Sequence, residues 1–393
     1  MAASAKEYSS SKVRKYLPFV SLLAVAIASI TAVIVAHQLT QPDTGKQLAE
    51  SPLNRNRLAY LVSNKHYRLP DYQEVYRHTH SIQELDHYLH TLDPYSKYLS
   101  SAEVAFIKER SNKSRTGIGL DLLMNRGKIL GVPILQGPAY QAGMILPAYI
   151  NSIDGHKISY SDFSSYAFLT KYHPGKIVPV KLESRTKSGK SDYAIKTAKY
   201  INQPILHFTY NDIFTIYIKK FSAGLNGQLN ELLEMSKGYK KLVFDLRHCP
   251  GGDLYAMVDM VSQILPGSLN VVTIQKANGS DELTLRTLPN KVIGHPQLIL
   301  LTSEFTASSA ELFTWAIKIH EPTALIVGQP TKGKCMAQDT LPLADGSAIL
   351  LTTFEVLNAA NQSCQGIPMV LDLPIHDIAL LSYTDIFHSL SVK

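Results

Sequence analysis

The fold can be worked out from residues 241–252, which read KLVFDLRHCPGG. The first five, Lys241 to Asp245, are mostly apolar, which is typical of a strand buried on both faces. The pair Gly251-Gly252 then precedes an apolar segment that continues to Leu265, for which we expect a helix. A buried strand that leads through a glycine turn into a helix indicates an α/β domain.

The same alternation continues on both sides of this stretch. Further strands are expected at 214–218, 297–302 and 323–327, and further helices at 225–235 and 306–319. Strands that alternate with helices predict a largely parallel sheet covered by helices. A hairpin is expected from 336–341 and 348–354, joined by Ala344-Asp345-Gly346. We therefore predict one α/β domain over residues 201–393.

Two different regions precede this domain. Residues 113–200 contain short alternating runs separated by glycines, with a short helix near 140–142, and predict a small β-rich domain. Residues 54–112 have helical apolar spacing, in which Ile82, Leu85, Leu89 and Leu92 form one stripe. The opposite face of that helix carries His80, Glu84, His87 and His90, which indicate either a solvated polar face or a zinc site.

The first 53 residues predict a membrane anchor. Residues 17–36 are uncharged and match the ~20 residues that cross a hydrocarbon core. The basic segment 1–16 precedes them, so we expect it in the cytoplasm and the rest of the chain across a lipid bilayer. A cleaved signal peptide is the alternative. Residues 37–53 are polar, contain two prolines and are interpreted as a linker.

The composition excludes several classes of protein. Of 393 residues, 45% are hydrophobic and 18% charged, so most of the chain is not disordered. The net charge is +7, and the first fifteen residues contribute three of these charges, so the remainder is too diffuse to indicate nucleic-acid binding. Three cysteines are too few for a disulfide scaffold or a four-cysteine zinc site.

Three loops of the α/β domain carry residues suited to catalysis. Gly251-Gly252 can present N–H groups to an oxyanion, or can simply form a tight turn. Ser308 lies between a buried strand and the start of a helix, where it can act as a nucleophile. Alternatively, Thr306 or Ser308 only caps the helix, together with Glu311. Lys334 follows Gly333 and is expected in half-buried surroundings, which would lower its pKa as a general base requires. The alternative is a surface lysine beside a turn.

A Ser-Lys pair is one of two nucleophile–base combinations that these residues allow. The other is a Ser-His pair that uses His248 or His320, although nothing in the setting of His320 supplies an orienting acid. The sequence contains no G-x-S-x-G, H-E-x-x-H, Walker or strand-linked G-x-G-x-x-G motif, so it predicts neither a cofactor nor a catalytic metal.

Several motifs in order resemble the carboxyl-terminal processing proteases, also called tail-specific proteases, over residues 55–375. Residues 92–99 are similar to L-D-P-x-S-x-Y-L, 245–252 to D-L-R-x-N-P-G-G, 306–311 to T-A-S-A-S-E, and 328–338 to G-x-x-T-x-G-K-x-x-x-Q. Residues 117–120 and 137–143 resemble the carboxylate-binding turn and helix start of a PDZ domain, and Asp154-Gly155 resembles its closing turn. The resemblance implies a PDZ-like domain at 113–200 and a crotonase/Clp-protease-like core at 201–393.

The resemblance also implies roles for individual residues. Ser308 would be the nucleophile, Lys334 the general base and Gln338 the residue that orients the lysine. Backbone N–H groups of Gly251 or Gly252 and of Ser309 would form the oxyanion hole. The turn made by Gly117, Ile118, Gly119 and Leu120 would bind the carboxylate of a substrate tail.

The implied function is a membrane-anchored, periplasm-facing serine endopeptidase of the bacterial inner membrane. Its substrates would be proteins or peptides with exposed, apolar C-termini, and a homodimer or an adaptor protein is a further option. The alternative is a non-catalytic binding or scaffold protein with the same fold.

Two departures from the family pattern leave questions open. Ser309-Ala310 stand where the family has Ala-Ser, and the spacing to Lys334 is one residue longer than expected, so Ser309 is the alternative nucleophile. His248 and Cys249 also replace the usual residues, and Ala148-Tyr149 replace Gly-Asp, which bears on tail specificity. A disulfide such as Cys335–Cys364 could lock the active site in an oxidising compartment, or all three cysteines are buried thiols.

Overall fold

The computed structural model describes residues 54–125, 127–158, 173–183, 189–280, 282–289 and 296–391. The predicted basic segment, anchor and linker at 1–53 lie outside these residues. Among the described helices, none combines the length and the apolar character that crossing a membrane requires.

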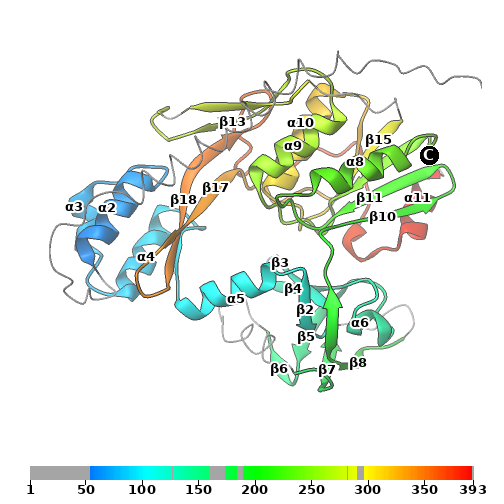
Figure 1. The fold of residues 1–393 in the computed structure, drawn as a ribbon, viewed down its shortest axis with the longest axis horizontal. Coiled ribbons are helices and arrows are strands. Elements are labelled where there is room, and N and C mark those ends of the chain that lie inside the picture. The colour runs from blue at the N-terminus through cyan, green and yellow to red at the C-terminus, as the bar shows by residue number, and fades with distance from the viewer. Residues whose placement is uncertain are drawn as a thin grey trace, which may run out of the picture. The chain divides into compact units, whose positions relative to one another are not determined.

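A six-stranded sheet forms the centre of the C-terminal domain (Figure 1). Every pairing in it is parallel except that between its first two strands. Its strands, in spatial order, are β10 (Ile205–Tyr210), β11 (Ile213–Ile218), β12 (Lys241–Asp245), β15 (Gln297–Thr302), β16 (Leu325–Gly328) and β19 (Leu373–Pro374). The prediction of a mixed α/β protein is confirmed.

Both faces of this sheet are covered because successive side chains of a strand point to opposite faces. Leu242 and Phe244 of β12 pack in the cluster formed with α8 (Asn226–Met235), α9 (Leu254–Ile264) and α10 (Ser309–His320). Val243 of the same strand belongs to a second cluster, which includes residues of α11 (Tyr383–Ser391) and the 3-10 helix Ile378–Leu380. This burial on two sides explains the continuous apolar run in the sequence.

An antiparallel sheet lies beside the central one and contains the predicted hairpin. Its strands are β1 (Lys97–Leu99), β18 (Ala348–Leu357), β13 (Asn270–Gln275) and β14 (Leu283–Arg286), and β17 (Met336–Pro342) pairs with β18. The helices α2 (Arg55–Lys65), α3 (Tyr72–Arg77) and α4 (Ile82–Leu92) share a core with Ile349 and Leu351 of β18. The helical N-terminal region, which continues through α5 (Ser101–Ser111), is therefore packed against the hairpin that follows Lys334.

The β-rich module has its own core. Its elements are β2 (Ser114–Gly117), β3 (Leu120–Asn125), β4 (Lys128–Pro133), α6 (Pro138–Gln141), β5 (Ala148–Ile153), β6 (His156–Lys157), β7 (Ile177–Leu182), β8 (Asp192–Lys196) and β9 (Ala198–Ile201). In β7 exposed and buried residues alternate strictly, as the sequence predicted.

Two predicted helix starts were wrong by a few residues. The helix after Gly251-Gly252 begins at Leu254, because the Asp253 side chain caps it by accepting from the Ala256 N–H at 2.8 Å. The helix expected from residue 306 begins at Ser309, because residues 303–306 form a turn in which the Thr306 N–H donates to the Ser303 carbonyl at 2.9 Å.

The polar face of α4 has local hydrogen bonds instead of a metal-binding arrangement. His90 Nδ1 lies 2.7 Å from the Asp86 carbonyl, and His80 Nε2 lies 3.2 Å from the Arg55 guanidinium. Across the described ranges no group of three or more His, Cys, Asp or Glu side chains is arranged to hold a metal.

Candidate active site

Ser308 lies in the turn between β15 and α10 with an unusual backbone. Its φ is +56° and its ψ is −126°, a conformation that non-glycine residues rarely adopt. Ser308 is half-buried and lines a cavity of about 550 Å³.

The neighbouring Ser309 lines the same cavity, but its hydroxyl has different contacts. It is buried, with 2% of its surface exposed, and its hydroxyl donates to the Gly252 carbonyl at 3.0 Å. A buried hydroxyl that already donates to a carbonyl is poorly suited to attack a substrate. The geometry therefore favours Ser308 over the alternative nucleophile.

The glycine pair lies directly against the serine turn. A Cβ atom built on Gly251 would lie 2.8 Å from both the Ala307 carbonyl and the Ser308 Cβ, so only glycine fits there. Gly252 lines the same cavity as Ser308. Within the described part of the chain, the N–H groups of Gly252 and Ser309 have no hydrogen-bond acceptor. Two such donors beside a nucleophile suit an oxyanion.

Lys334 lines the same cavity, together with Gln338 from β17. Its ammonium Nζ donates to Gln338 Oε1 at 2.5 Å and lies 5.0 Å from the centre of the Tyr95 ring. Burial, with a contribution from Lys332, lowers the pKa of Lys334 to about 8, although Glu311 and Asp93 oppose this shift. An amine with this pKa can accept a proton near neutral pH. The partial burial of Lys334 argues against the alternative of a surface lysine.

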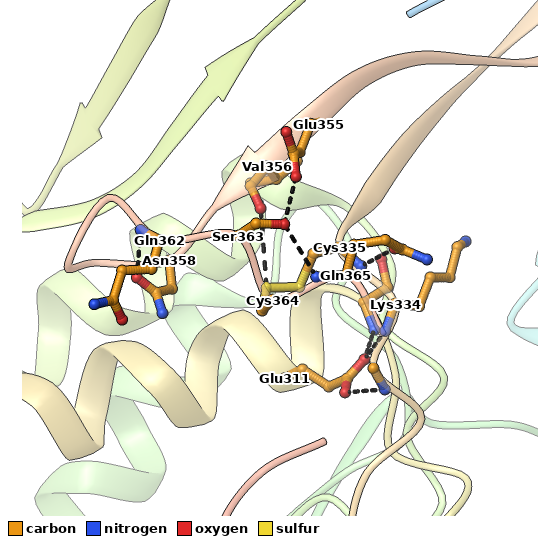
Figure 2. The surroundings of a disulfide bond; sticks show 12 residues. Glu311, Lys334, Cys335, Glu355, Val356, Asn358, Gln362, Ser363, Cys364 and Gln365 are labelled. Carbon is orange, nitrogen blue, oxygen red and sulfur yellow. Dashed lines mark hydrogen bonds between the residues drawn. A yellow bond between two sulfur atoms is a disulfide. The ribbon is translucent and has the colours of Figure 1, made fainter. Parts of the chain in front are cut away.

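Glu311 connects the serine helix to the lysine loop (Figure 2). Its carboxylate accepts from the Ser308 N–H at 2.9 Å, the Gly333 N–H at 2.6 Å and the Lys334 N–H at 2.8 Å. Because both loops bind one buried carboxylate, the distance between nucleophile and base is constrained. The sequence indicated only a capping role for Glu311, so this connecting role was not predicted.

A disulfide between Cys335 and Cys364 follows the lysine directly (Figure 2). The Cys335 N–H also donates to Gln365 Oε1 at 2.9 Å, and the Gly366 N–H donates to the Gly333 carbonyl at 2.8 Å. The hypothesis of a Cys335–Cys364 pair is confirmed, whereas Cys249 is a buried free thiol. Together these bonds hold the loop that presents Lys334.

The two histidines considered as general bases make hydrogen bonds outside the cavity of Ser308. His248 is buried, its Nε2 donates to the Ala379 carbonyl at 2.8 Å, and its Nδ1 accepts from the Tyr217 hydroxyl at 3.1 Å. Burial and the neighbouring Arg247 lower the pKa of His248 to about 4. His320 donates to the Asn270 carbonyl at 2.6 Å, and neither histidine lines the cavity of Ser308.

The predicted tail-binding turn is separate from this cavity. Gly117, Ile118 and Leu120 line another cavity of about 330 Å³ between β2, β3 and β9. Gly119 packs on the start of α6, where a Cβ atom would lie 2.6 Å from Pro138 Cδ. The described structure therefore brings the catalytic candidates together and leaves the tail-binding candidates in the β-rich module.

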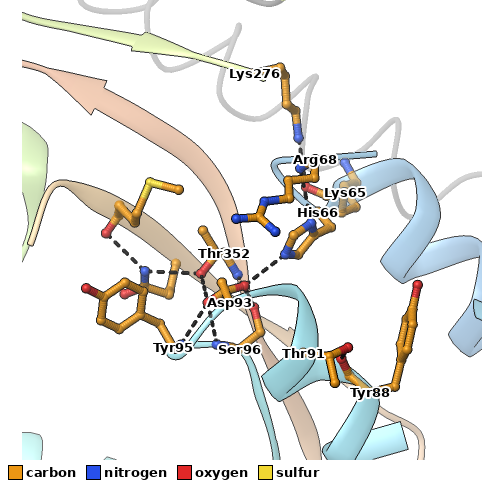
Figure 3. A network of polar contacts seen from close by, with 12 residues as sticks. Lys65, His66, Arg68, Tyr88, Thr91, Asp93, Tyr95, Ser96, Lys276 and Thr352 are labelled. Carbon is orange, nitrogen blue, oxygen red and sulfur yellow. Dashed lines mark hydrogen bonds and ion pairs between the residues drawn. The ribbon is translucent and has the colours of Figure 1, made fainter. Parts of the chain in front are cut away.

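Asp93 and Tyr95 were also missed as site residues. Both belong to the quoted motif at 92–99, to which no role was assigned. The centre of the Tyr95 ring lies 5.0 Å from Lys334 Nζ. Asp93 accepts from the Thr352 hydroxyl of β18 (Figure 3), and this hydroxyl lies 3.4 Å from Gln338 Nε2. Only the order of motifs in the sequence indicated that this distant turn matters.

Comparison with known proteins agrees with this geometry. Residues 212–374, which contain the serine turn, the glycine pair and the lysine loop, match the profile of peptidase family S41. Over this segment the chain is similar to peptidase family S41. The predicted resemblance to carboxyl-terminal processing proteases is thereby confirmed.

Two curated relatives of similar sequence agree with this match. A probable CtpA-like serine protease of Staphylococcus saprophyticus is 26% identical over 294 residues, covering 74% of this chain and 59% of the relative. A protein of the same description from Staphylococcus haemolyticus is 25% identical over 277 residues, covering 70% and 55%. The chain thus spans somewhat more than half the length of these curated relatives.

The fold is shared with a photosystem II D1 C-terminal processing protease. The TM-score is 0.64 at 19% identity, and the match covers 84% of this chain and 94% of the other. At this identity the likeness concerns the fold alone.

Proposed function

We propose that this S41-family chain is a serine endopeptidase that uses Ser308 and Lys334 as a catalytic dyad. The observation that carries the proposal is the shared cavity, which has a half-buried serine in a strained turn on one side and an amine of lowered pKa on the other. Glu311 supports it by binding both loops. A Ser-Lys pair is an established alternative to Ser-His-Asp.

The proposed mechanism is acyl transfer. The neutral Lys334 amine accepts the Ser308 proton while the Oγ attacks the scissile carbonyl. The resulting oxyanion accepts hydrogen bonds from the N–H groups of Gly252 and Ser309, and Gln338 holds the lysine. The protonated lysine then gives its proton to the leaving amine, and water hydrolyses the acyl-enzyme by the reverse transfer.

The proposed substrates are proteins or peptides recognised by exposed, apolar C-termini. The β-rich module at 113–200 supports this as a PDZ-like domain, with a cavity lined by Gly117, Ile118 and Leu120 beside the buried apolar core. Residues 17–36 are proposed as a membrane anchor that leaves the peptidase domain on the periplasmic side, on the basis of their charge and hydropathy.

Cleavage assays test the proposed dyad. The full chain, Ser308→Ala and Ser309→Ala are each incubated with an unfolded protein that has an apolar C-terminus, and products are identified by mass spectrometry. We expect cleavage by the wild type and by Ser309→Ala, and none by Ser308→Ala. Loss in Ser309→Ala alone would move the nucleophile by one residue, and an inactive wild type with retained tail binding would favour a binding protein.

A further inference from the structure

A buried carboxylate, Asp93, lies behind the lysine and glutamine of the candidate site. It ends α4 and has 7% of its surface exposed. Five donors surround it within 2.6–2.9 Å: His66 Nε2, the Tyr95 N–H, the Ser96 N–H, the Ser96 hydroxyl and the Thr352 hydroxyl (Figure 3). So many donors require an ionised acceptor.

The protonation of this cluster follows from its contacts. The Arg68 N–H donates to His66 Nδ1 at 3.1 Å, so the proton of a neutral His66 is on Nε2 and points to Asp93. Burial alone would raise the pKa of Asp93, but the hydrogen bonds from His66, Ser96, Tyr95 and Thr352 hold it well below its usual range. Asp93 is therefore a fixed negative charge.

The Thr352 hydroxyl links Asp93 to Gln338. A threonine hydroxyl has one proton, and at Thr352 that proton goes to Asp93 Oδ1 at 2.8 Å. Its lone pairs can then accept from Gln338 Nε2, which lies 3.4 Å away and also donates to the Met336 carbonyl at 3.0 Å. These contacts fix which end of the Gln338 amide faces Lys334.

The amide orientation matters to the chemistry of the lysine. With Nε2 held by Thr352 and Met336, Gln338 turns Oε1 toward Lys334 Nζ. A neutral amine that donates one N–H to this oxygen keeps its lone pair for the serine proton. A flipped amide would present N–H groups to Lys334 and would compete for that lone pair.

The same turn also contacts the lysine directly. Tyr95 follows Asp93 by two residues, and its ring centre lies 5.0 Å from Lys334 Nζ. The Tyr95 hydroxyl accepts from Gln365 Nε2 at 2.9 Å, next to the disulfide that holds the lysine loop. The turn after α4 thus borders the general base on one side and supports Gln338 on the other.

We propose that Asp93 is a positioning residue, which acts through the Thr352 hydroxyl to fix the Gln338 amide and thereby Lys334. The helical N-terminal region then completes the active site, because it supplies both Asp93 and Tyr95. This inference rests on the proposed Ser-Lys function.

The first test removes one hydroxyl in the full-length protein. Thr352→Val keeps the shape of the side chain and the Thr352 N–H that donates to Ser96 Oγ at 2.9 Å. The matched control is Thr215→Val in β11, a threonine fully buried whose hydroxyl has no hydrogen-bond partner among the described residues. We expect kcat to fall about tenfold or more in Thr352→Val with KM unchanged. The reason is that a misplaced general base loses part of the rate acceleration of about 10²–10⁴-fold that proton transfer contributes.

The second test follows the lysine without any cleavage. In the Ser308→Ala background, the Cε resonance of ¹³C-labelled lysine is titrated and assigned by its loss in Lys334→Arg. The charged groups that face Lys334 are Lys332, Glu311 and Asp93. Asp93→Asn removes a charge that favours the ammonium, so we expect the titration midpoint to move to lower pH by about half a unit or more.

The outcomes separate this inference from the proposed function. An inactive wild type together with the expected shift in the titration would reject the peptidase function and keep the positioning role of Asp93. Equal kcat in Thr352→Val and Thr215→Val, or an unmoved midpoint in Asp93→Asn, would overturn the positioning role. A Thr352→Val protein whose melting temperature falls far below that of Thr215→Val, with the midpoint unmoved, would reduce Asp93 to a structural residue.

Discussion

The pKa of Lys334 is the result of opposing influences from its surroundings. Burial and Lys332 favour the neutral amine, whereas Glu311 and Asp93 favour the ammonium, and the balance is a pKa of about 8. Gln338 accepts one N–H of the amine. A base with this pKa is mostly protonated at neutral pH, so a fraction of the enzyme is competent at any moment.

The pH dependence of cleavage follows from this balance. Because only the neutral amine accepts the serine proton, kcat/KM should rise about tenfold per pH unit below about 8 and level off above it. The profile is measured between about pH 5.5 and 9.5 with circular dichroism as a control for folding. An acid limb centred near the ordinary histidine pKa of about 6.5 would contradict the lysine as base.

Gly251 packs so closely against the serine turn that a larger residue should disturb the site. Gly251→Ala introduces a Cβ that would meet Ala307 and Ser308 atoms at 2.8 Å, in a backbone with φ of +103°. Gly267→Ala is the matched control, because its φ is +88° but no atom lies within 4 Å. We expect Gly251→Ala to lose about a hundredfold in kcat, as when an oxyanion donor is removed, while Gly267→Ala loses only stability.

Equal activity in the two glycine variants would show that the close approach of Gly251 to the serine turn is unimportant. The melting temperatures of both variants are also measured. Backbone strain from a positive φ should lower both melting temperatures, whereas the steric effect at the site should affect Gly251→Ala alone.

At the scale of elements, the loop before β17 is held from two directions. Glu311 binds the N–H groups of Gly333 and Lys334 from α10, and the disulfide ties Cys335 to Cys364. The Val356 N–H of β18 adds a bond to the Cys335 carbonyl at 2.8 Å. The lysine is thus presented by a short segment whose backbone has little freedom.

Removing the disulfide should destabilise the protein and slow the reaction. The bond joins residues 29 apart, for which loop-closure entropy gives a contribution of about 3–4 kcal/mol to the free energy of unfolding. A Cys335→Ser/Cys364→Ser variant is compared with the wild type by thermal melting, with and without a thiol reductant. The reductant should lower the melting temperature of the wild type alone, and equal melting of both proteins without it would contradict a stabilising disulfide.

At the scale of the whole molecule, the β-rich module contacts the loop that leads to the nucleophile. Glu304 of that loop accepts from Asn125 Nδ2 at 2.7 Å and from the Tyr149 hydroxyl at 3.0 Å. Phe305, the next residue, shares a buried cluster with Leu130 of the module. The position of the module is therefore coupled to residues only a few positions before Ser308.

Loosening this contact should be visible near the active site. Tyr149→Phe removes one hydrogen bond to a carboxylate, worth about 1–2 kcal/mol, and should speed amide hydrogen exchange in residues 303–308. Tyr60→Phe is the control, since Tyr60 is 60% exposed on α2. Identical exchange in the two variants would show that the module and the serine loop are uncoupled.

Local periodicity and motif order predicted much of this protein. The limits of β12 and β15, the hairpin and the assembly of Ser308, Lys334 and Gln338 around one cavity follow from apolar runs and quoted motifs. Helix starts were less well predicted, because the caps at Asp253 and the turn before Ser309 depend on a few local hydrogen bonds.

The α/β class, the resemblance to a protease family and the choice of candidate residues came from the sequence alone, because strand and helix periods and short motifs are local properties of the chain. The tertiary structure was needed to show that the Ser309 hydroxyl already donates to the Gly252 carbonyl, that Cys335 pairs with Cys364, and that Asp93 is linked to Gln338 through Thr352. Asp93 and Thr352 are 259 residues apart in the chain. Contacts across such separations depend on how the helical region packs on β18, and no local pattern encodes that packing.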